Sequence, residues 1–366
     1  MKVTNLIVGA GLSGLTLAER LANIKGEDVL IIERRNHIGG NVYDYDEDGI
    51  LVHKYGTHIF HTNDKNVWEY LNQFTRFYPY MHEVKALVDG QLVSVPFNLN
   101  TLFALLPRTQ AKQVESLLLK HFNVGDKISI LELQKLPEFA FLSEFIYKKI
   151  FLHYTLKQWQ CKPDELDSSV FERVPVLIGK DNRYFNDIFQ GIPMQGYTQM
   201  CKKMCENKLI TLKLNCDYKH IASSIKARRI FFSGAIDEFF NYELGELPYR
   251  SLHFDFVRFE REYFQKYSVV NYPNNYDYTR IGEYKYFLDA KTPHTIISFE
   301  YSKMCQSGDE RYYPVPNAQN ASLYEAYLKK ARALENVYFI GRLGEYKYYD
   351  MDNVISKALA LFEALE

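Results

Sequence analysis

The sequence predicts an α/β fold in which a parallel sheet is interrupted by a helical bundle and by an antiparallel sheet. Both ends of the chain contain an apolar strand, a glycine turn and the start of a helix. Residues 99–160 instead place apolar side chains at helical spacing, and residues 247–301 contain successive strand-like runs. After the helical block and the strand block, a strand and a helix appear again near the end of the chain. This order indicates one sheet with two insertions.

The first elements carry a nucleotide-binding pattern. An apolar strand at residues 3–8 is followed by a glycine turn at residues 9–14, a helix, and a second apolar strand that ends at Glu33. Glycines in such a turn let the backbone approach a pyrophosphate, and an acidic residue about twenty positions later binds a ribose. The sequence therefore predicts a Rossmann-type dinucleotide-binding domain.

The residues directly after Glu33 distinguish between dinucleotides. A basic residue, Arg34, and the pair Gly39-Gly40 follow the acid, as in flavoproteins that hold FAD in an extended form. An NAD dehydrogenase usually continues into a helix and a third plain strand. We therefore expect FAD.

The middle of the chain changes pattern twice. A short alternating segment contains Asp89-Gly90, which is a hairpin signal. Helical spacing follows, and residues 196–232 return to helix and strand before the later strands begin. We expect three domains: a discontinuous FAD-binding domain at 1–75, 195–240 and 318–366, a helical bundle with a mobile substrate loop at 99–190, and an antiparallel sheet at 76–98 and 241–317.

Composition limits the partners. The 366 residues carry a net charge of -1, which argues against a nucleic-acid surface. No apolar run approaches the length of a membrane span, so we expect a cytoplasmic protein without membrane insertion. The odd number and scattered positions of the cysteines favour reduced thiols over a metal site; they are Cys161, Cys201, Cys205, Cys216 and Cys305.

Aromatic residues are unusually frequent, with 29 tyrosines and 25 phenylalanines. Half-buried strands would account for them. So would a cleft lined with phenols that stack on rings and form hydrogen bonds with sugar hydroxyls.

Ten short motifs, in order from about Leu6 to Leu359, resemble those of the bacterial UDP-galactopyranose mutase family. They are HIGGN, YGTHIFHTN, YTLKQW, RVPV, YFND, QGIPMQGYT, YRSL, YTRIGEYKYF, YYPV and GRLGEYKYYDMDNVISKAL. The resemblance implies a homodimer that converts UDP-galactopyranose to UDP-galactofuranose without net redox, using FAD in its reduced form. In that chemistry the flavin nitrogen-5 attacks the anomeric carbon, UDP leaves, and a sugar-flavin iminium forms.

The resemblance also implies roles for individual residues. Arg280 and Arg342 would hold the diphosphate, Arg173 would close over the substrate from its loop, and His58 would contact the flavin and sugar or serve as a structural histidine. Cofactor contacts are expected from Gly9, Gly11, Leu12, Ser13, Gly14, Glu33, Arg34, Gly40, Asn41, His58, Ile59, Arg342, Asp350 and Met351. Substrate contacts are expected from Phe151, Tyr154, Thr155, Trp159, Arg173, Tyr184, Arg280, Tyr313, Arg342 and Tyr348.

Three alternatives remain. UDP-N-acetylgalactosamine could be the main or a second substrate, which depends on the space around Thr57, His58 and Arg173. A flavin oxidoreductase could use the same cofactor frame but would not need paired phosphate-binding arginines. A noncatalytic nucleotide-binding protein would have no use for the aromatic and basic side chains.

Overall fold

The computed structural model describes residues 2–160, 166–167, 170 and 174–365. The chain divides into two compact units. The first comprises Met1–Tyr80, Asp187–Tyr249 and Asp309–Glu366, and the second comprises Met81–Asn186 and Arg250–Gly308. Both the expected helical bundle and most of the expected antiparallel sheet belong to the second unit. Within the described ranges, no helix is both long and apolar enough to cross a membrane.

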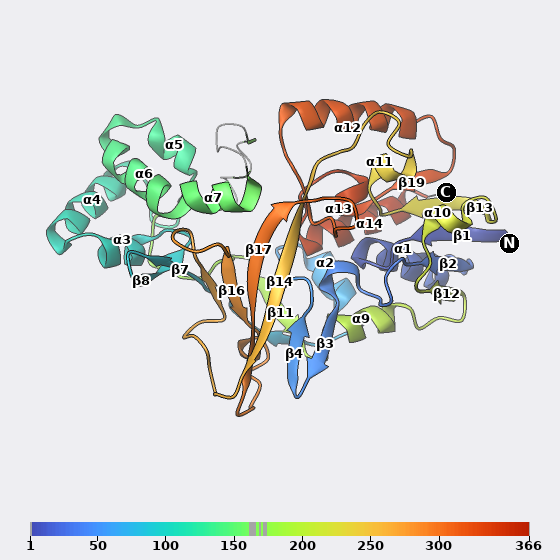
Figure 1. Cartoon of the computed structure of the whole chain (residues 1–366), viewed down its shortest axis with the longest axis horizontal. Coiled ribbons are helices and arrows are strands. Elements are labelled where there is room, and N and C mark those ends of the chain that lie inside the picture. The colour runs from blue at the N-terminus through green and yellow to red at the C-terminus, as the bar shows by residue number, and fades with distance from the viewer. Residues whose placement is uncertain (1, 161–165, 168–169, 171–173, 366) are drawn as a thin grey trace. The chain divides into compact units, whose positions relative to one another are not determined.

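A five-stranded parallel sheet forms the centre of the first unit (Figure 1). Its strands follow the order β12 (Ile210–Lys213), β2 (Val29–Ile32), β1 (Lys2–Val8), β13 (Lys226–Phe232) and β19 (Val337–Phe339). Each neighbouring pair is parallel. The predicted α/β fold is confirmed, because the last strand of the chain returns to the sheet that the first strand began.

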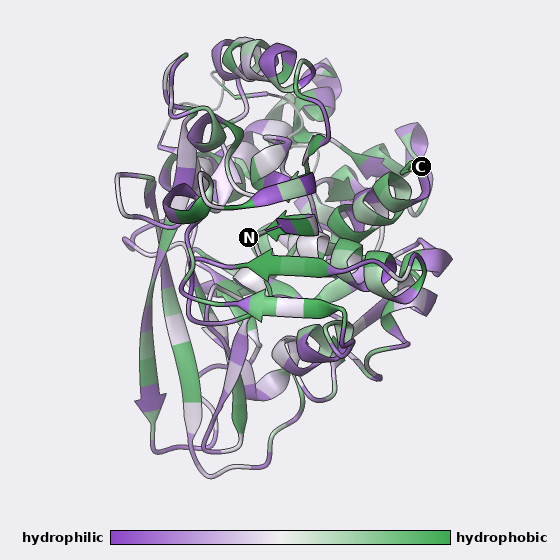
Figure 2. Ribbon diagram, turned by 90° about the vertical axis from the view of Figure 1, so that its right-hand side faces the viewer, coloured by the Kyte–Doolittle hydropathy of each residue, from purple (hydrophilic) through white to green (hydrophobic). Residues whose placement is uncertain are grey.

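Apolar side chains on the two faces of this sheet pack against different helices, as the strand period of two requires. Ile7 and Ile31 belong to a core shared with α1 (Leu12–Asn23), α9 (Tyr197–Met204) and α14 (Met351–Glu363). Their neighbours Leu6 and Leu30 point the other way and pack near α10 (Tyr218–Ile221). The strands beside the N-terminus are accordingly largely apolar along their length (Figure 2).

Further elements complete the first unit. They are η1 (Gly40–Val42), β3 (Asp44–Glu47), β4 (Ile50–His53), β5 (Phe60–Thr62), α2 (Lys65–Leu71), β6 (Phe77–Pro79), β11 (Phe189–Pro193), α11 (Ile236–Phe239), β18 (Tyr313–Pro314), α12 (Ala318–Ala331) and α13 (Gly341–Gly344).

The second unit contains the larger, mainly antiparallel sheet. Its strands in this unit follow the order β14 (Tyr249–Phe259), β17 (Thr295–Met304), β16 (Arg280–Glu283), β15 (Val269–Asn271), β7 (Val84–Val88) and β8 (Gln91–Val95). Only β15 and β7 pair in parallel among these strands. The predicted turn between β7 and β8 is confirmed, with Asp89 and Gly90 both at positive φ (48° and 80°), as a two-residue hairpin requires.

The helices of the second unit lie where helical spacing predicts them. They are α3 (Leu99–Leu105), α4 (Arg108–His121), α5 (Ile130–Gln134), η2 (Pro137–Phe139), α6 (Ala140–Ile146), η3 (Tyr147–Phe151) and α7 (Leu152–Trp159), with η5 (Tyr284–Tyr286) between β16 and β17. The short strands β9 (Lys127–Ile128) and β10 (Val176–Leu177) pair with each other. The π-helical η3 joins α6 to α7, and such turns are frequent at functional sites.

Candidate active site

Two glycine turns of the first unit approach each other closely at the carboxyl end of β1. Gly9 has a φ of 105°, and a Cβ added to Gly40 would lie 2.9 Å from the Cα of Gly11. Gly14 lies in the first turn of α1, where a Cβ would meet the Gly9 carbonyl oxygen at 2.2 Å. The absence of side chains at Gly9 and Gly11 therefore leaves the backbone open to a ligand. The absence of a side chain at Gly14 lets α1 pack against the glycine turn that precedes it.

The two ends of the chain line one cavity. A Cβ at Gly9 would lie 2.1 Å from Ser233 Oγ, and a Cβ at Gly341 would lie 2.6 Å from Ser13 Oγ. The N-terminal turn therefore contacts both the end of β13 and the turn after β19. The cavity wall includes, among other residues, Gly9, Gly11, Leu12, Ser13, Glu33, Arg34, Gly40, Asn41, His58, Ser233, Arg342, Leu343 and Met351.

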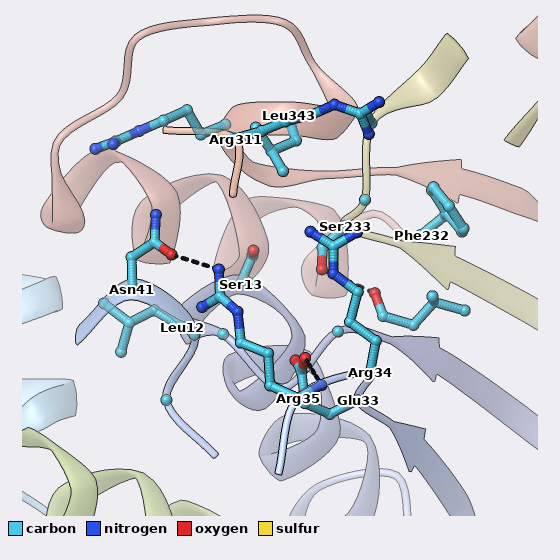
Figure 3. Close-up of a pocket in the computed structure, with 18 of the residues that line it drawn as sticks. Leu12, Ser13, Glu33, Arg34, Arg35, Asn41, Phe232, Ser233, Arg311 and Leu343 are labelled. Carbon is cyan, nitrogen blue, oxygen red and sulfur yellow. Dashed lines mark hydrogen bonds between the residues drawn. The ribbon is translucent and has the colours of Figure 1, made fainter. Parts of the chain in front are cut away.

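Glu33 is buried in this wall and is held by backbone amides. Its carboxylate accepts hydrogen bonds from the N–H groups of Ala10 and Arg35, both at 2.9 Å. The side chain of Arg35 extends across the cavity to Asn41, to which it donates a hydrogen bond of 3.0 Å (Figure 3). The carboxylate therefore has a fixed position at the end of β2, where this fold binds a ribose.

Two helices begin at the cavity without a side-chain cap. Gly11, the N-cap residue of α1, has no side chain that could cap the helix. Asp350 is the N-cap residue of α14, and its side chain makes no capping hydrogen bond. Leu12 and Met351, the first residues of these helices, line the cavity. Free N–H groups and the positive end of a helix dipole suit a diphosphate or an electron-rich ring. Asp350 directly precedes α14, but its carboxylate does not cap that helix.

Charged residues that sequence reasoning missed connect the segments around the cavity. Glu238 forms ion pairs with Arg34 (3.8 Å) and Arg311 (2.9 Å), and Glu310 pairs with Arg34 and Arg35. Arg311 and Glu238 both line the cavity. The matched motif YYPV begins directly after Arg311, which is a signal that could have identified this residue.

His58 reaches the cavity as a neutral imidazole. Burial lowers its pKa to about 3, with a further contribution from His53. Its Nδ1 lies 2.7 Å from the carbonyl oxygen of Gly56. Because a carbonyl can only accept, Nδ1 carries the proton, and Nε2 is left with a lone pair.

Arg342 lies between two phenol rings in the first unit. Its guanidinium carbon is 5.2 Å from the ring centre of Tyr313 and 5.3 Å from that of Tyr348. It also donates to the carbonyl oxygens of Tyr349 (2.5 Å) and Tyr312 (3.3 Å). These contacts orient the planar cation at the cavity wall, and three of the expected substrate-contacting residues, Arg342, Tyr313 and Tyr348, lie together.

Arg280 is oriented within the second unit. Its Nη2 donates a hydrogen bond of 2.6 Å to the hydroxyl of Tyr154 on α7, and its Nε lies 3.5 Å from the carboxylate of Glu300. Burial disfavours the charged guanidinium, but Glu300 and Tyr154 outweigh that effect and raise the pKa of Arg280. The phenol of Tyr184 also raises the pKa of Arg280. Arg280, Tyr154 and Tyr184 are therefore neighbours.

The other expected residues have different surroundings. Phe151, Thr155 and Trp159 are buried along η3 and α7. Gly14, Ile59 and Asp350 are not among the residues that line the cavity of the first unit. Arg173 and Cys161 lie outside the described residues, so their predicted roles stay predictions.

Comparison with known proteins identifies relatives over nearly the whole chain. A family model described as UDP-galactopyranose mutase matches residues 149–348, and one described as an NAD(P)-binding Rossmann-like domain matches residues 7–74. A probable UDP-galactopyranose mutase of Klebsiella pneumoniae is 39% identical over 97% of this chain and 92% of its own length. A dTDP-fucopyranose mutase of Escherichia coli is 38% identical over 97% and 96%. A crystal structure of reduced UDP-galactopyranose mutase shares the fold, with a TM-score of 0.71, 15% identity and coverage of 99% of this chain and 95% of that one.

Proposed function

The chain belongs to the UDP-galactopyranose mutase family, and from that premise we propose that it interconverts UDP-galactopyranose and UDP-galactofuranose. It is an isomerase of the mutase class, and FAD is its cofactor. We also propose that it acts in the cytoplasm as a homodimer.

The cavity of the first unit fits FAD. The close glycine turns leave room for a diphosphate, the uncapped start of α1 supplies N–H donors to it, and Glu33 is placed for a ribose. When bound and reduced, the flavin supplies a nucleophilic nitrogen for the anomeric carbon. The chain's own residues then have to hold the nucleotide and control protons.

Two guanidinium groups carry the nucleotide part of the proposal. Arg280 is oriented by Tyr154, and Arg342 by backbone carbonyls and two phenols. Oriented guanidinium groups bind phosphate oxygens bidentately and stabilise the negative charge that grows as UDP leaves. Arg173 is proposed as a third contact with the substrate.

His58 is proposed to act on the sugar or flavin side as an acceptor. Its Nδ1 proton is committed to the Gly56 carbonyl, so Nε2 can accept a hydrogen bond or a proton but cannot donate one. The low pKa of His58 keeps it neutral at physiological pH, so it does not place a second positive charge beside Arg342.

One observation carries the proposal beyond the shared fold: Arg342 lies at the wall of the dinucleotide cavity, between the rings of Tyr313 and Tyr348. A flavin oxidase acting on a neutral substrate needs no oriented cation for that substrate. A phosphate-bearing substrate does.

The test is turnover of defined nucleotide sugars by the anaerobic, dithionite-reduced enzyme. We expect UDP-galactofuranose from UDP-galactopyranose, identified by chromatography and NMR, with no product from the oxidised enzyme. UDP-N-acetylgalactosamine and dTDP-fucose are run in parallel, the second because the Escherichia coli relative is a dTDP-fucopyranose mutase. Faster turnover of either would replace UDP-galactose as the main substrate. In a parallel aerobic assay of the oxidised enzyme, oxygen consumption without furanose would indicate an oxidase.

A further inference from the structure

Lys157 on α7 binds the loop that leads into Arg280. Its ammonium group donates to the carbonyl oxygens of Tyr272, Tyr276 (3.0 Å) and Tyr278 (3.0 Å). A lysine ammonium has three N–H donors, and the three carbonyls use all of them. Lys157 therefore organises the chain rather than offering its charge to a ligand.

The same helix contacts Arg280 itself. Tyr154 lies three residues before Lys157, so the two side chains share one face of α7, and the Tyr154 hydroxyl accepts the hydrogen bond from Arg280. The loop 272–278 ends two residues before Arg280. One helix face thus holds both the guanidinium and the loop that precedes it.

Hydrogen bonds within the sheet hold the two ends of loop 272–278 together. The N–H of Tyr272 donates to the carbonyl of Thr279 (2.8 Å), and the N–H of Thr279 donates to the carbonyl of Glu300 (2.8 Å). These bonds close the loop at its base, where β15 and β16 pair. They leave the middle of the loop, from Pro273 to Asp277, to be held from the side of η3 and α7, where the Asn274 amide donates to the backbone carbonyl of Lys149 (3.0 Å).

The carboxyl end of α7 is itself anchored. Arg250 on β14 is fully buried and donates to the carbonyl of Gln158 (2.7 Å), to which the Ser302 hydroxyl on β17 also donates (2.8 Å). Helix, loop and sheet therefore form a closed set of contacts, in which Lys157 is the cationic connection between helix and loop.

We propose that Lys157 is a positioning residue, which clamps loop 272–278 onto α7 so that Arg280 stays at Tyr154. The inference rests on the proposed function, because Arg280 is there the diphosphate ligand. Without the ammonium, the three carbonyls lose a charge-assisted partner. The start of β16 then moves relative to α7, and the guanidinium is no longer preorganised.

Lys157→Met and Lys157→Arg test the clamp, and Lys149→Met is the matched control. Lys149 lies about two turns earlier, in η3, which runs directly into α7. Its ammonium pairs with Asp89 at 2.8 Å, and its side chain is 38% exposed. Hydrogen exchange of the ligand-free proteins is the first measurement. In Lys157→Met we expect faster exchange at the Tyr272 and Thr279 amides, with no change in Lys149→Met. Unchanged exchange in Lys157→Met would overturn the proposal whether or not UDP binds.

UDP affinity and steady-state kinetics are the second measurement. Loss of three charge-assisted bonds should raise the UDP Kd and the KM at least about tenfold in Lys157→Met. Because Arg280 is proposed both to bind the diphosphate and to stabilise the charge that grows as UDP leaves, kcat should fall together with the affinity. Lys157→Arg keeps the charge and should recover most of the affinity. A fall in kcat alone, or no recovery with arginine, would contradict the clamp.

A double-mutant cycle separates positioning from general damage. In an Arg280→Ala background, Lys157→Met should change the UDP Kd by less than about twofold, because the group it positions is absent. An equal loss of UDP affinity in the wild-type and Arg280→Ala backgrounds would mean that Lys157 acts on UDP independently of Arg280. If the wild-type protein binds no UDP, the proposed function fails, while the exchange measurement still decides the role of Lys157.

Discussion

Replacing Gly341 by alanine tests whether the two ends of the chain support each other. Gly341 has a φ of 76°, and an added Cβ would lie 2.6 Å from Ser13 Oγ and 3.5 Å from Ser13 Cβ. The left-handed backbone costs an alanine about 1–2 kcal/mol. The overlap with Ser13 costs about another 1–3 kcal/mol, as in an overpacked core.

The two contributions can be separated with Ser13→Ala. Removing Oγ leaves the nearest Ser13 atom at an ordinary contact distance, so the double variant should retain only the backbone cost. We expect Gly341→Ala to lower the free energy of unfolding by about 2–5 kcal/mol in the wild-type background, and by about 1–2 kcal/mol in the Ser13→Ala background.

Urea unfolding of the FAD-free proteins, followed by circular dichroism, measures the four members of this cycle. Working without the cofactor keeps any loss of FAD binding out of the comparison. A Gly341→Ala cost that is the same in both backgrounds would refute the reasoning, because residues 13 and 341 would then not be in contact.

Three other predictions address the site. Gly40→Ala should abolish FAD retention, since its Cβ meets backbone at 2.9 Å, whereas Gly26→Ala, with positive φ but open space, should keep the flavin absorbance. Arg342→Ala should abolish turnover and retain FAD; a colourless variant would show that Arg342 holds the cofactor instead. Because the pKa of His58 is lowered to about 3, His58 should stay neutral between about pH 5 and pH 8. A kcat inflection in that range that disappears in His58→Gln would contradict this.

Local patterns predicted the fold well because its main signals are short-range. The glycine turn, the strand before it and Glu33 lie within one stretch of sequence, and helical spacing is a property of each segment alone. The return of β19 to the first sheet was also predictable, because residues 337–341 repeat the strand-and-turn pattern of the N-terminus.

The parts that were missed depend on contacts between distant residues. The ion pair of Arg35 with Glu310 joins positions 275 residues apart, and no local pattern indicates it. Lys157 lies within the motif YTLKQW, which assigns it no role of its own. Its three carbonyl partners lie more than 100 residues further along the chain. Backbone carbonyls carry no sequence signal, so such a clamp becomes visible only in three dimensions.

The central claim is that the flavin acts in its reduced form without net redox, and the flavin absorbance during anaerobic turnover tests it most directly. Enzyme reduced once with dithionite should stay bleached while it makes many equivalents of UDP-galactofuranose. Return of the oxidised spectrum in step with product, or the need for one equivalent of reductant per product, would contradict the account.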